Sequence, residues 1–381
     1  MSYFVAVAVL CMGFGVWSAY GELSLEPVLT DLDTPWDVAF GDEWMYVTTR
    51  PGILYGVHEG EVTPLLHMRV SGGEGGMLGV ATHEGMIYVY YTDINNGNRV
   101  SRYTHTEDGL KHDIDIIQDI PSAAIHNGGR IRFGPDAMLY VTTGDAGNPN
   151  HSQDVNSLAG KILRLNPDGI IPADNPVPGS PVYAYGLRNP QGITWDTNNT
   201  MYVTDHGPSG LFENAHDEIN QIIPYGNYGW PDSVGDRVTS GTIAPLIHSG
   251  AVTWAPSGLE FINGSGILEW EGMLLYGALR GAHLGTVNID GSGHATYLDG
   301  EIGRIRAPIQ HPNGTVYVIT SNTDGRGLPY EGHDMLLRVT FDMSIPDKYE
   351  YLADILWNMY RDGHLTVQQL HVALGYVSSL S

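Results

Sequence analysis

The chain has 381 residues, of which 49 are glycine, and its formal net charge is −25. So acidic a chain repels phosphates, which argues against a nucleic-acid-binding protein, and its high glycine share argues against a mainly helical fold. An apolar share of 42% is enough to form a large hydrophobic core and argues against global disorder.

The N-terminal segment has the composition of an export signal. Residues 1–19 are apolar, small or aromatic and carry no charge, and Ser18-Ala19-Tyr20-Gly21 supplies a small-x-small ending. This pattern predicts a signal peptide over residues 1–21 and an extracytoplasmic protein, secreted or periplasmic. A buried first strand and an uncleaved membrane anchor are the alternatives. Because the single cysteine, Cys11, lies in this segment, a processed chain would have no disulfide and no thiol chemistry.

From residue 22 to residue 345 one pattern recurs six times: an alternating apolar run, a turn, and a second run centred on a tyrosine. The six tyrosines are Tyr46, Tyr88, Tyr140, Tyr202, Tyr276 and Tyr317. Their spacing suits propeller blades of about 40–50 residues, with the longer intervals taken up by loops. The sequence therefore predicts an all-β, six-bladed β-propeller with four-stranded blades over residues 22–345. Separate β-sandwich domains are the alternative.

Mostly polar residues follow each central tyrosine by about four positions. They are Arg50, Thr92-Asp93, Gly144-Asp145, His206, Arg280 and Ser321-Asn322. Equivalent positions in equivalent blades face the same end of a propeller. Because the set includes charged groups beside glycine-rich loops, we expect it to ring one mouth of the central channel.

The C-terminal residues, 346–381, change from a strand-like to a helical pattern. Two apolar stripes recur at helical spacing, with Asp362-Gly363 between them. The stripes are Leu352, Ile355, Leu356 and Met359, then Leu370, Ala373, Leu374 and Val377. We predict a short helical hairpin that packs on the propeller or contacts another protein.

A series of glycine-rich and polar motifs runs along the repeats and is densest between residues 126 and 231. In chain order the motifs are Gly73-Glu74-Gly75-Gly76, His126-Asn127-Gly128-Gly129-Arg130, Gly144-Asp145, Gly186-Leu187-Arg188-Asn189-Pro190, His206-Gly207-Pro208, Asp217-Glu218, Asn227-Tyr228-Gly229-Trp230-Pro231 and Gly303-Arg304-Ile305-Arg306. In this order they resemble the soluble quinoprotein glucose/sorbosone dehydrogenase family, which includes the aldose sugar dehydrogenases. The resemblance covers roughly residues 30–341 and implies a six-bladed propeller.

Two residue types in these motifs suggest chemistry independently of the resemblance. Histidine titrates near neutral pH, so His126, on a glycine-rich loop, is a candidate general base. Arg304 and Arg306 have the spacing that places two side chains on one face of a strand. Guanidinium groups bind carboxylates through paired hydrogen bonds. Ordinary surface ion pairing remains the alternative for any single arginine.

The resemblance implies a specific reaction, the oxidation of an aldose at C1 to the lactone with pyrroloquinoline quinone (PQQ) as hydride acceptor. It makes His126 the base, Arg188 the residue that stabilises the reduced quinone, and Asp145 a residue that orients His126 or binds the quinone. The cofactor-binding set it implies is Glu74, His126, Asp145, Arg188, Asn189, Arg280, Arg304 and Arg306. The implied partners are an aldose sugar and an external electron acceptor.

Calcium is the metal that the resemblance implies. Gly207 and Pro208 resemble the loop whose two carbonyls hold a PQQ-bound calcium ion, and Glu218 with the Tyr228 carbonyl resembles a second, structural calcium site. Carboxylate and carbonyl oxygens are the ligands that calcium prefers. Taken alone, Asp217-Glu218 is equally well read as a solvated pair on a loop.

Two positions depart from the family pattern. Glu74 stands where the family usually has glutamine, and a carboxylate there would repel an anionic cofactor unless arginine or calcium intervenes. Arg280 stands where lysine is usual, which keeps the charge but changes its geometry. Two other functions stay open on these residues: a non-catalytic propeller that binds a glycan or a protein, and a hydrolase that uses a channel carboxylate.

Overall fold

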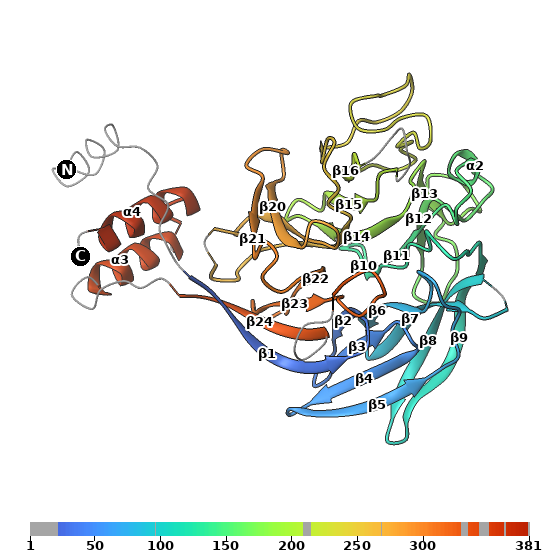
Figure 1. Cartoon of the computed structure of the whole chain (residues 1–381), viewed down its shortest axis with the longest axis horizontal. Helices are drawn as coiled ribbons and strands as arrows, with labels where there is room; N and C mark the ends of the chain where they lie inside the picture. Colours follow the sequence, from blue (N-terminus) through green and yellow to red (C-terminus); the bar gives the residue numbers. More distant parts are fainter. Residues whose placement is uncertain are drawn as a thin grey trace.

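The computed structural model describes residues 22–95, 97–208, 215–267, 269–328, 334–342, 350–361 and 363–379; the predicted signal peptide lies outside these ranges. Six antiparallel sheets of four strands each are arranged around a common centre (Figure 1). The predicted all-β, six-bladed propeller with four-stranded blades is confirmed.

In each of the first five sheets the strands follow one another in chain order. The first two sheets are β2 (Pro35–Phe40), β3 (Met45–Thr49), β4 (Ile53–His58) and β5 (Glu61–His67), then β6 (Met77–His83), β7 (Met86–Asp93), β8 (Gly97–Thr106) and β9 (Gly109–Ile120). The third is β10 (Ile131–Phe133), β11 (Leu139–Thr143), β12 (Lys161–Leu165) and β13 (Val182–Tyr185), with the short helix α2 (Asn150–Gln153) between β11 and β12. The fourth and fifth are β14 (Pro190–Trp195), β15 (Met201–Asp205), β16 (Glu218–Ile222) and β17 (Ile247–His248), then β18 (Pro256–Phe261), β19 (Met273–Ala278), β20 (His283–Asn288) and β21 (Ala295–Tyr297).

The sixth sheet joins the two ends of the propeller. It contains β22 (Ile305–Gln310), β23 (Val316–Thr320) and β24 (Asp334–Asp342), and its fourth strand is β1 (Glu22–Leu32). Strand β1 pairs antiparallel with β24, from Glu22 opposite Asp342 to Leu32 opposite Asp334. The ring therefore closes through backbone hydrogen bonds between segments about 300 residues apart, and β1 covers the outer edge of β24.

The six tyrosines of the sequence repeat all lie on the second strand of a blade. These strands are β3, β7, β11, β15, β19 and β23. Their aromatic rings pack between neighbouring sheets, and Tyr276 on β19 is fully buried. The repeat thus marks the same structural position in every blade.

Neighbouring blades approach so closely near the centre that some positions accept only glycine. A Cβ atom on Gly79 of β6 would lie 2.3 Å from the Gly129 carbonyl oxygen, and one on Gly258 of β18 would lie 2.3 Å from the Ala307 Cβ. Both distances are shorter than any tolerable contact. Part of the high glycine content is therefore required by how the first strands of adjacent blades pack.

A buried ion cluster lies where the first strands of three blades meet. Asp37 on β2 is fully buried, and both Arg130 and Arg132 of the third blade pair with its carboxylate. Burial alone would raise the pKa of Asp37, but the two guanidinium groups hold it below its ordinary value.

We expect Asp37→Asn to lower the free energy of unfolding by about 3–5 kcal/mol, because it leaves two buried guanidinium groups without their counterion. Denaturant unfolding measures the loss. As a control, Glu26→Gln removes an exposed pair with Arg338 and should cost less than about 1 kcal/mol. Equal losses in the two variants would contradict the role of burial.

The Asp37 carboxylate also makes the free energy of unfolding depend on pH. Folding lowers the pKa of Asp37. Its contribution to the free energy of unfolding is therefore complete above the pKa of an ordinary aspartate and is lost as the pH falls through the lowered, folded-state pKa. Asp37→Asn should therefore flatten this acid limb of the stability curve.

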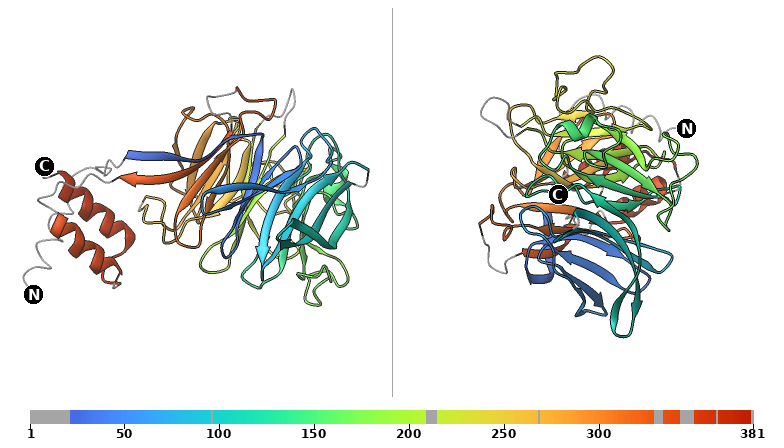
Figure 2. Two further views of the ribbon diagram at one scale, coloured as in Figure 1. Left: turned by 90° about the horizontal axis from the view of Figure 1, so that it is seen from below. Right: turned by 90° about the vertical axis from the view of Figure 1, so that its right-hand side faces the viewer.

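The two C-terminal helices lie together, apart from the six sheets (Figures 1 and 2). They are α3 (Glu350–Arg361) and α4 (Val367–Ser379), as the hairpin prediction required. Gly363, between them, has a left-handed φ of 74°. In the described part of the chain, no helix is both long and apolar enough to cross a membrane.

The predicted apolar stripe of α3 is partly wrong. Leu352 and Ile355 are exposed, whereas Ala353 is buried against α4. The partly buried residues Leu356, Trp357 and Tyr360 pack on the same cluster. Burying the larger aromatic side chains removes more apolar surface from water. The buried face of α3 therefore includes Trp357 and Tyr360 and excludes Leu352 and Ile355. In α4, Leu370, Leu374 and Val377 are buried as predicted.

Candidate active site

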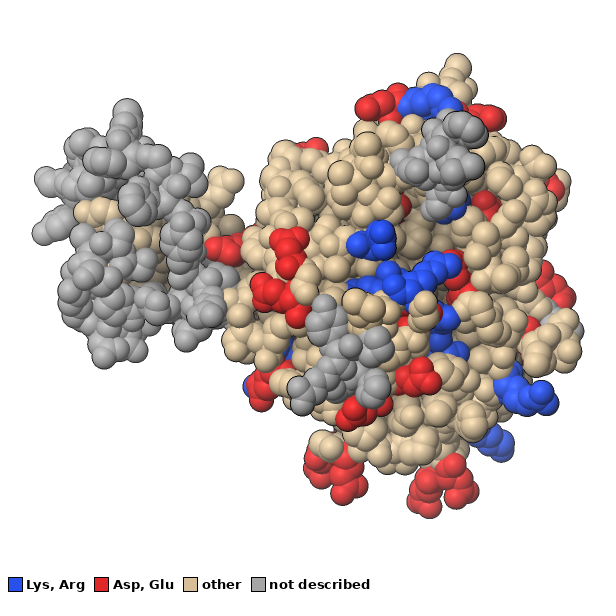
Figure 3. Space-filling view, in the orientation of Figure 1, with Lys and Arg blue, Asp and Glu red and all other residues tan. Residues whose placement is uncertain are grey.

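A cavity of about 230 Å³ lies where loops and strand ends of different blades converge. It is lined by Trp36, Arg50, Gly73, Glu74, Ala124, Gln191, His206, Leu279, Arg304, Arg306, Asp324, Gly325 and Arg326. Figure 3 shows basic side chains gathered in the hollow at the centre of this face. Of the residues expected to ring the channel mouth, Arg50 and His206 line this cavity.

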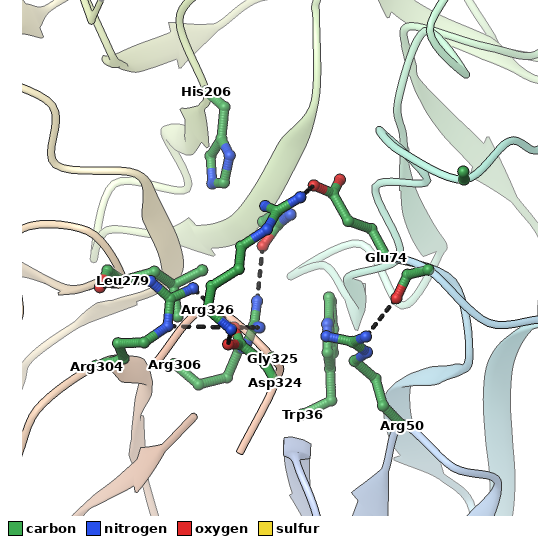
Figure 4. A pocket seen from close by; sticks show the side chains of 13 residues that line it. Trp36, Arg50, Glu74, His206, Leu279, Arg304, Arg306, Asp324, Gly325 and Arg326 are labelled. Atoms are coloured by element: carbon green, nitrogen blue, oxygen red, sulfur yellow. Dashed lines mark hydrogen bonds and ion pairs between the residues drawn. The ribbon is translucent and has the colours of Figure 1, made fainter. Parts of the chain in front are cut away.

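The cavity is cationic, with four arginines against two carboxylates. Arg304 pairs with Asp324 at 2.7 Å, and Arg326 reaches across the cavity to Glu74, also at 2.7 Å (Figure 4). The other two arginines, Arg50 and Arg306, have no carboxylate oxygen within 2.7 Å among the described residues. The cavity thus carries an excess of positive charge in a chain that is strongly acidic overall.

An indole forms one wall of the cavity. Trp36 on β2 is almost fully buried and, in Figure 4, stands between Arg50 and Arg306. The Arg130 guanidinium lies 4.0 Å from the Trp36 ring centroid, a cation–π contact that holds the ring in place. The wall is therefore flat, aromatic and rigid, which suits a planar ligand.

His126 and Asp145 form a hydrogen-bonded pair on two neighbouring loops. The His126 Nδ1 lies 2.7 Å from the Asp145 Oδ1, and the indole N–H of Trp230 donates to Oδ2 at 2.9 Å. Burial alone would raise the pKa of Asp145, but these bonds hold it below its ordinary value. An ionised Asp145 places the imidazole proton on Nδ1, so Nε2 is left with a free lone pair.

The glycines of the surrounding motifs make this pairing sterically feasible. His126 has a left-handed φ of 58°, and its carbonyl oxygen would lie only 2.1 Å from a Cβ on Gly144. Gly144 therefore cannot be replaced without moving the loop that carries Asp145. This contact explains why a His-Asn-Gly-Gly segment is followed, on the next loop, by Gly-Asp.

Glu74 links the cavity to the imidazole. Its Oε2 accepts the backbone N–H of His126 at 2.9 Å, while Oε1 pairs with Arg326. Burial alone would raise the pKa of Glu74, but the His126 N–H and the Arg326 charge together lower it. The carboxylate that departs from the family pattern is therefore balanced by an arginine, as the sequence argument required.

Arg188 and Asn189 are held by a buried carboxylate that the sequence analysis did not single out. Asp205 accepts the backbone N–H groups of Arg188 and Asn189 at 2.9 and 2.6 Å. The Arg188 guanidinium lies 5.4 Å from the Trp230 ring centroid and donates to the His206 carbonyl. Trp230 thus lies between Arg188 and Asp145, and connects the two predicted catalytic motifs.

His206 contributes a half-buried imidazole to the cavity lining. Its Nε2 is shielded from solvent and has no hydrogen-bond partner among the residues that the structure describes. Burial lowers the pKa of His206 to about 4, so the ring is neutral at neutral pH. It is therefore a polar group available to a ligand without adding charge.

Of the eight predicted cofactor-binding residues, Glu74, Arg304 and Arg306 line the cavity, and Arg280 lies outside the site. The other four lie in the hydrogen-bonded network beside the cavity: His126, Asp145, Arg188 and Asn189. Arg280 is exposed and does not line the cavity. The preceding residue, Leu279, lines the cavity instead. Its carbonyl accepts a hydrogen bond from Arg304. Arg304 and Arg306, by contrast, both line the cavity, as their spacing suggested.

The predicted metal ligands are found at two places. The Gly207 N–H donates to Asp217, and the Pro208 carbonyl accepts from Ala215. The half-buried Glu218 carboxylate accepts from the Gly235 N–H, while the Tyr228 hydroxyl donates to the Gln221 carbonyl. Within the described ranges, no three His, Cys, Asp or Glu side chains converge as a metal site.

Three of the six charged cavity residues were not among the predicted site residues. They are Arg50, Asp324 and Arg326. The sequence could have identified Arg50, because this residue lies four positions after a central tyrosine. Asp324 and Arg326 lie on a loop just beyond Ser321-Asn322, where the sequence gives no sign of how the chain turns.

A sequence profile of the Glucose / Sorbosone dehydrogenase family matches residues 32–337, most of the chain. The chain belongs to this family. It is 28% identical over 369 residues to the aldose sugar dehydrogenase of Escherichia coli K12, covering 84% of this chain and 96% of that protein. The PQQ-bound aldose sugar dehydrogenase of Streptomyces coelicolor has a TM-score of 0.75 and 35% identity, covering 85% of this chain and 99% of that one.

Family membership settles the general class of the protein. The resemblance seen in the motifs is confirmed, and the chain is an oxidoreductase of the sugar dehydrogenase type. Within this family the arginine-lined cavity and the His126–Asp145 pair are the candidate active site, because they bring cationic donors and an oriented base together.

Proposed function

We propose that this protein oxidises an aldose sugar at C1 to the corresponding lactone, with PQQ as cofactor and His126 as general base. The observation that carries the proposal is the His126–Asp145 pair, joined through Glu74 to an arginine-lined cavity. An external electron acceptor would then reoxidise the cofactor.

The cavity fits an anionic, planar cofactor. Arg50, Arg306 and His206 line it, and each has one solvent-shielded nitrogen without a hydrogen-bond partner among the described residues, which is unfavourable. Arg304, Arg306 and Arg50 would hold the carboxylates of PQQ, and Trp36 offers a flat surface to its rings. When bound, PQQ supplies a two-electron acceptor for the hydride that leaves C1.

The protein's own residues would move the proton. His126 Nε2 takes the proton of the C1 hydroxyl, so that the C1–O bond becomes the lactone carbonyl as the C1–H bond breaks. Asp145 keeps the imidazole in the tautomer that can accept this proton and stabilises the cation that forms. Arg188 supplies positive charge where negative charge develops during the transfer.

Sugar-dependent dye reduction tests the proposal. The purified protein is loaded with calcium and PQQ and assayed with a panel of aldoses and with sugar alcohols that have no C1 hemiacetal. We expect reduction with aldoses only, with the lactone as product. Loaded protein that reduces no dye with any aldose would overturn the proposal.

We further propose that calcium binds at the Gly207-Pro208 loop and beside Glu218. Burial and the nearby Asp217 raise the pKa of Glu218 to about 7, so this carboxylate is poorly stabilised without a cation. A divalent ion with oxygen ligands would relieve that cost.

Calcium is expected to raise the Tm of the apoprotein and to do so far less in Glu218→Gln. A ligand present at 100 times its Kd stabilises a protein by about 2.7 kcal/mol. The matched control is Glu260→Gln, another half-buried carboxylate whose pKa is raised to about 7 but which is not a predicted ligand. A calcium-induced shift of equal size in Glu218→Gln and wild type would exclude Glu218 as a ligand.

The other two functions lose their main support. The glycan- or protein-binding alternative rested on Glu74, on the altered pocket and on the C-terminal tail, and Arg326 neutralises the charge of Glu74. A hydrolase needs an available carboxylate pair, but the two cavity carboxylates, Glu74 and Asp324, are each engaged by an arginine. No specific contact favours either function over sugar oxidation.

A further inference from the structure

Arg50 is a half-buried cation beside Trp36 at the cavity wall. It follows β3 directly, and one Nη atom donates to the Gly73 carbonyl oxygen (Figure 4). Its Nε is shielded from solvent and has no hydrogen-bond partner. Among the described residues, no carboxylate forms an ion pair with Arg50.

The two cavity carboxylates act on Arg50 only from a distance, because each is already paired with another arginine. Asp324 is paired with Arg304 and Glu74 with Arg326. Arg306 is held by the neutral Gln191 side chain at 3.0 Å and lies 3.9 Å from Asp324. The cavity therefore contains two guanidinium groups in excess of its carboxylates.

The two excess cations also destabilise each other. Burial lowers the pKa of Arg50, and burial followed by repulsion from Arg50 and other arginines lowers that of Arg306 to about 9. Removing a guanidinium from water is unfavourable unless an anion accompanies it. The missing anion must enter the cavity from outside, because the nearby carboxylates are occupied.

We propose that Arg50 is a cofactor-binding residue that pairs with a carboxylate of the bound quinone, in addition to Arg304 and Arg306. The inference rests on the proposed function, since it takes PQQ as the ligand. The planar guanidinium lines the cavity and matches carboxylate geometry. Its one present bond, to the Gly73 carbonyl, holds the group in position without using up its charge.

Binding of PQQ and of its trimethyl ester to the calcium-loaded protein tests this directly. Quenching of tryptophan fluorescence is a suitable signal, because Trp36 lines the cavity. We expect Arg50→Gln to weaken PQQ binding roughly 10- to 100-fold, the value of one charge-assisted contact. The uncharged ester should bind Arg50→Gln and wild type equally. The PQQ affinity of Arg50→Lys, which keeps the charge, should lie between the affinities of Arg50→Gln and wild type.

The control variant is Arg99→Gln on β8, which removes the same charge from a surface pair with Asp115. It should bind both compounds as wild type does. If Arg50→Gln weakens PQQ and ester binding equally, Arg50 is structural and the inference is wrong. It is also wrong if the variant binds PQQ as tightly as wild type. If wild type itself binds no PQQ, the proposed function fails, and the inference fails with it.

Discussion

Replacing His126 by asparagine is expected to lower kcat for aldose oxidation by about 10²- to 10⁴-fold, the usual contribution of a positioned general base. His126 has a left-handed φ of 58°, and asparagine is among the few residues that adopt this conformation readily. The variant should therefore keep the loop and the backbone hydrogen bond to Glu74. Its PQQ affinity and Tm should stay close to those of wild type.

Steady-state kinetics and PQQ titration on the same preparation separate the chemical step from folding and binding. The control is His112→Asn, which removes a half-exposed histidine that also pairs with an aspartate, Asp115. That variant should retain full activity. A His126→Asn protein that binds PQQ and turns over at the wild-type rate would refute the assigned base, although the enzyme class would stand.

Asp145→Asn is expected to lower kcat by about 10²- to 10⁴-fold through the tautomer of His126. The amide can still accept the Trp230 N–H, but it would then present its NH₂ group to the His126 Nδ1. The imidazole proton would move to Nε2, which could no longer accept a proton from the sugar. The bonds to His126 and Trp230 are kept, but the Gly147 N–H loses its acceptor Oδ1, so we expect the Tm to fall by about the contribution of one hydrogen bond.

Asp145 is a positioning residue, so the readout must distinguish positioning from packing. We expect kcat to fall while KM and the Kd for PQQ change little, and Asp145→Glu to restore part of the rate. The matched control, Asp115→Asn, alters the surface pair with His112 and should leave kcat unchanged. Parallel losses of kcat, PQQ binding and Tm in Asp145→Asn would indicate a structural role instead.

The arrangement of the site explains how a strongly acidic protein can bind an anionic cofactor. Arginines that are far apart in the chain, such as Arg50 and Arg306, meet at the centre because each follows or begins a strand near the axis. Acidic side chains elsewhere on this face lie mainly toward its rim (Figure 3). The local field at the cavity is thus opposite in sign to the net charge of the chain.

Much of this protein could be predicted from local patterns. The repeat built on Tyr46, Tyr88 and their four counterparts determined the blade count, because one alternating strand and turn pattern defines one blade. The His126 and Arg304-Ile305-Arg306 motifs identified candidate base and carboxylate-binding groups, because side-chain chemistry and strand spacing are local properties.

Only the tertiary structure decided which of these groups face one another. The Arg326–Glu74 pair joins residues about 250 positions apart, and the Trp230–Asp145 bond crosses between two loops. Arg280 occupies the expected sequence position but is exposed, whereas Arg50 lines the cavity. Loop paths depend on contacts with other blades once the ring closes, and a short stretch of sequence contains no information about those contacts.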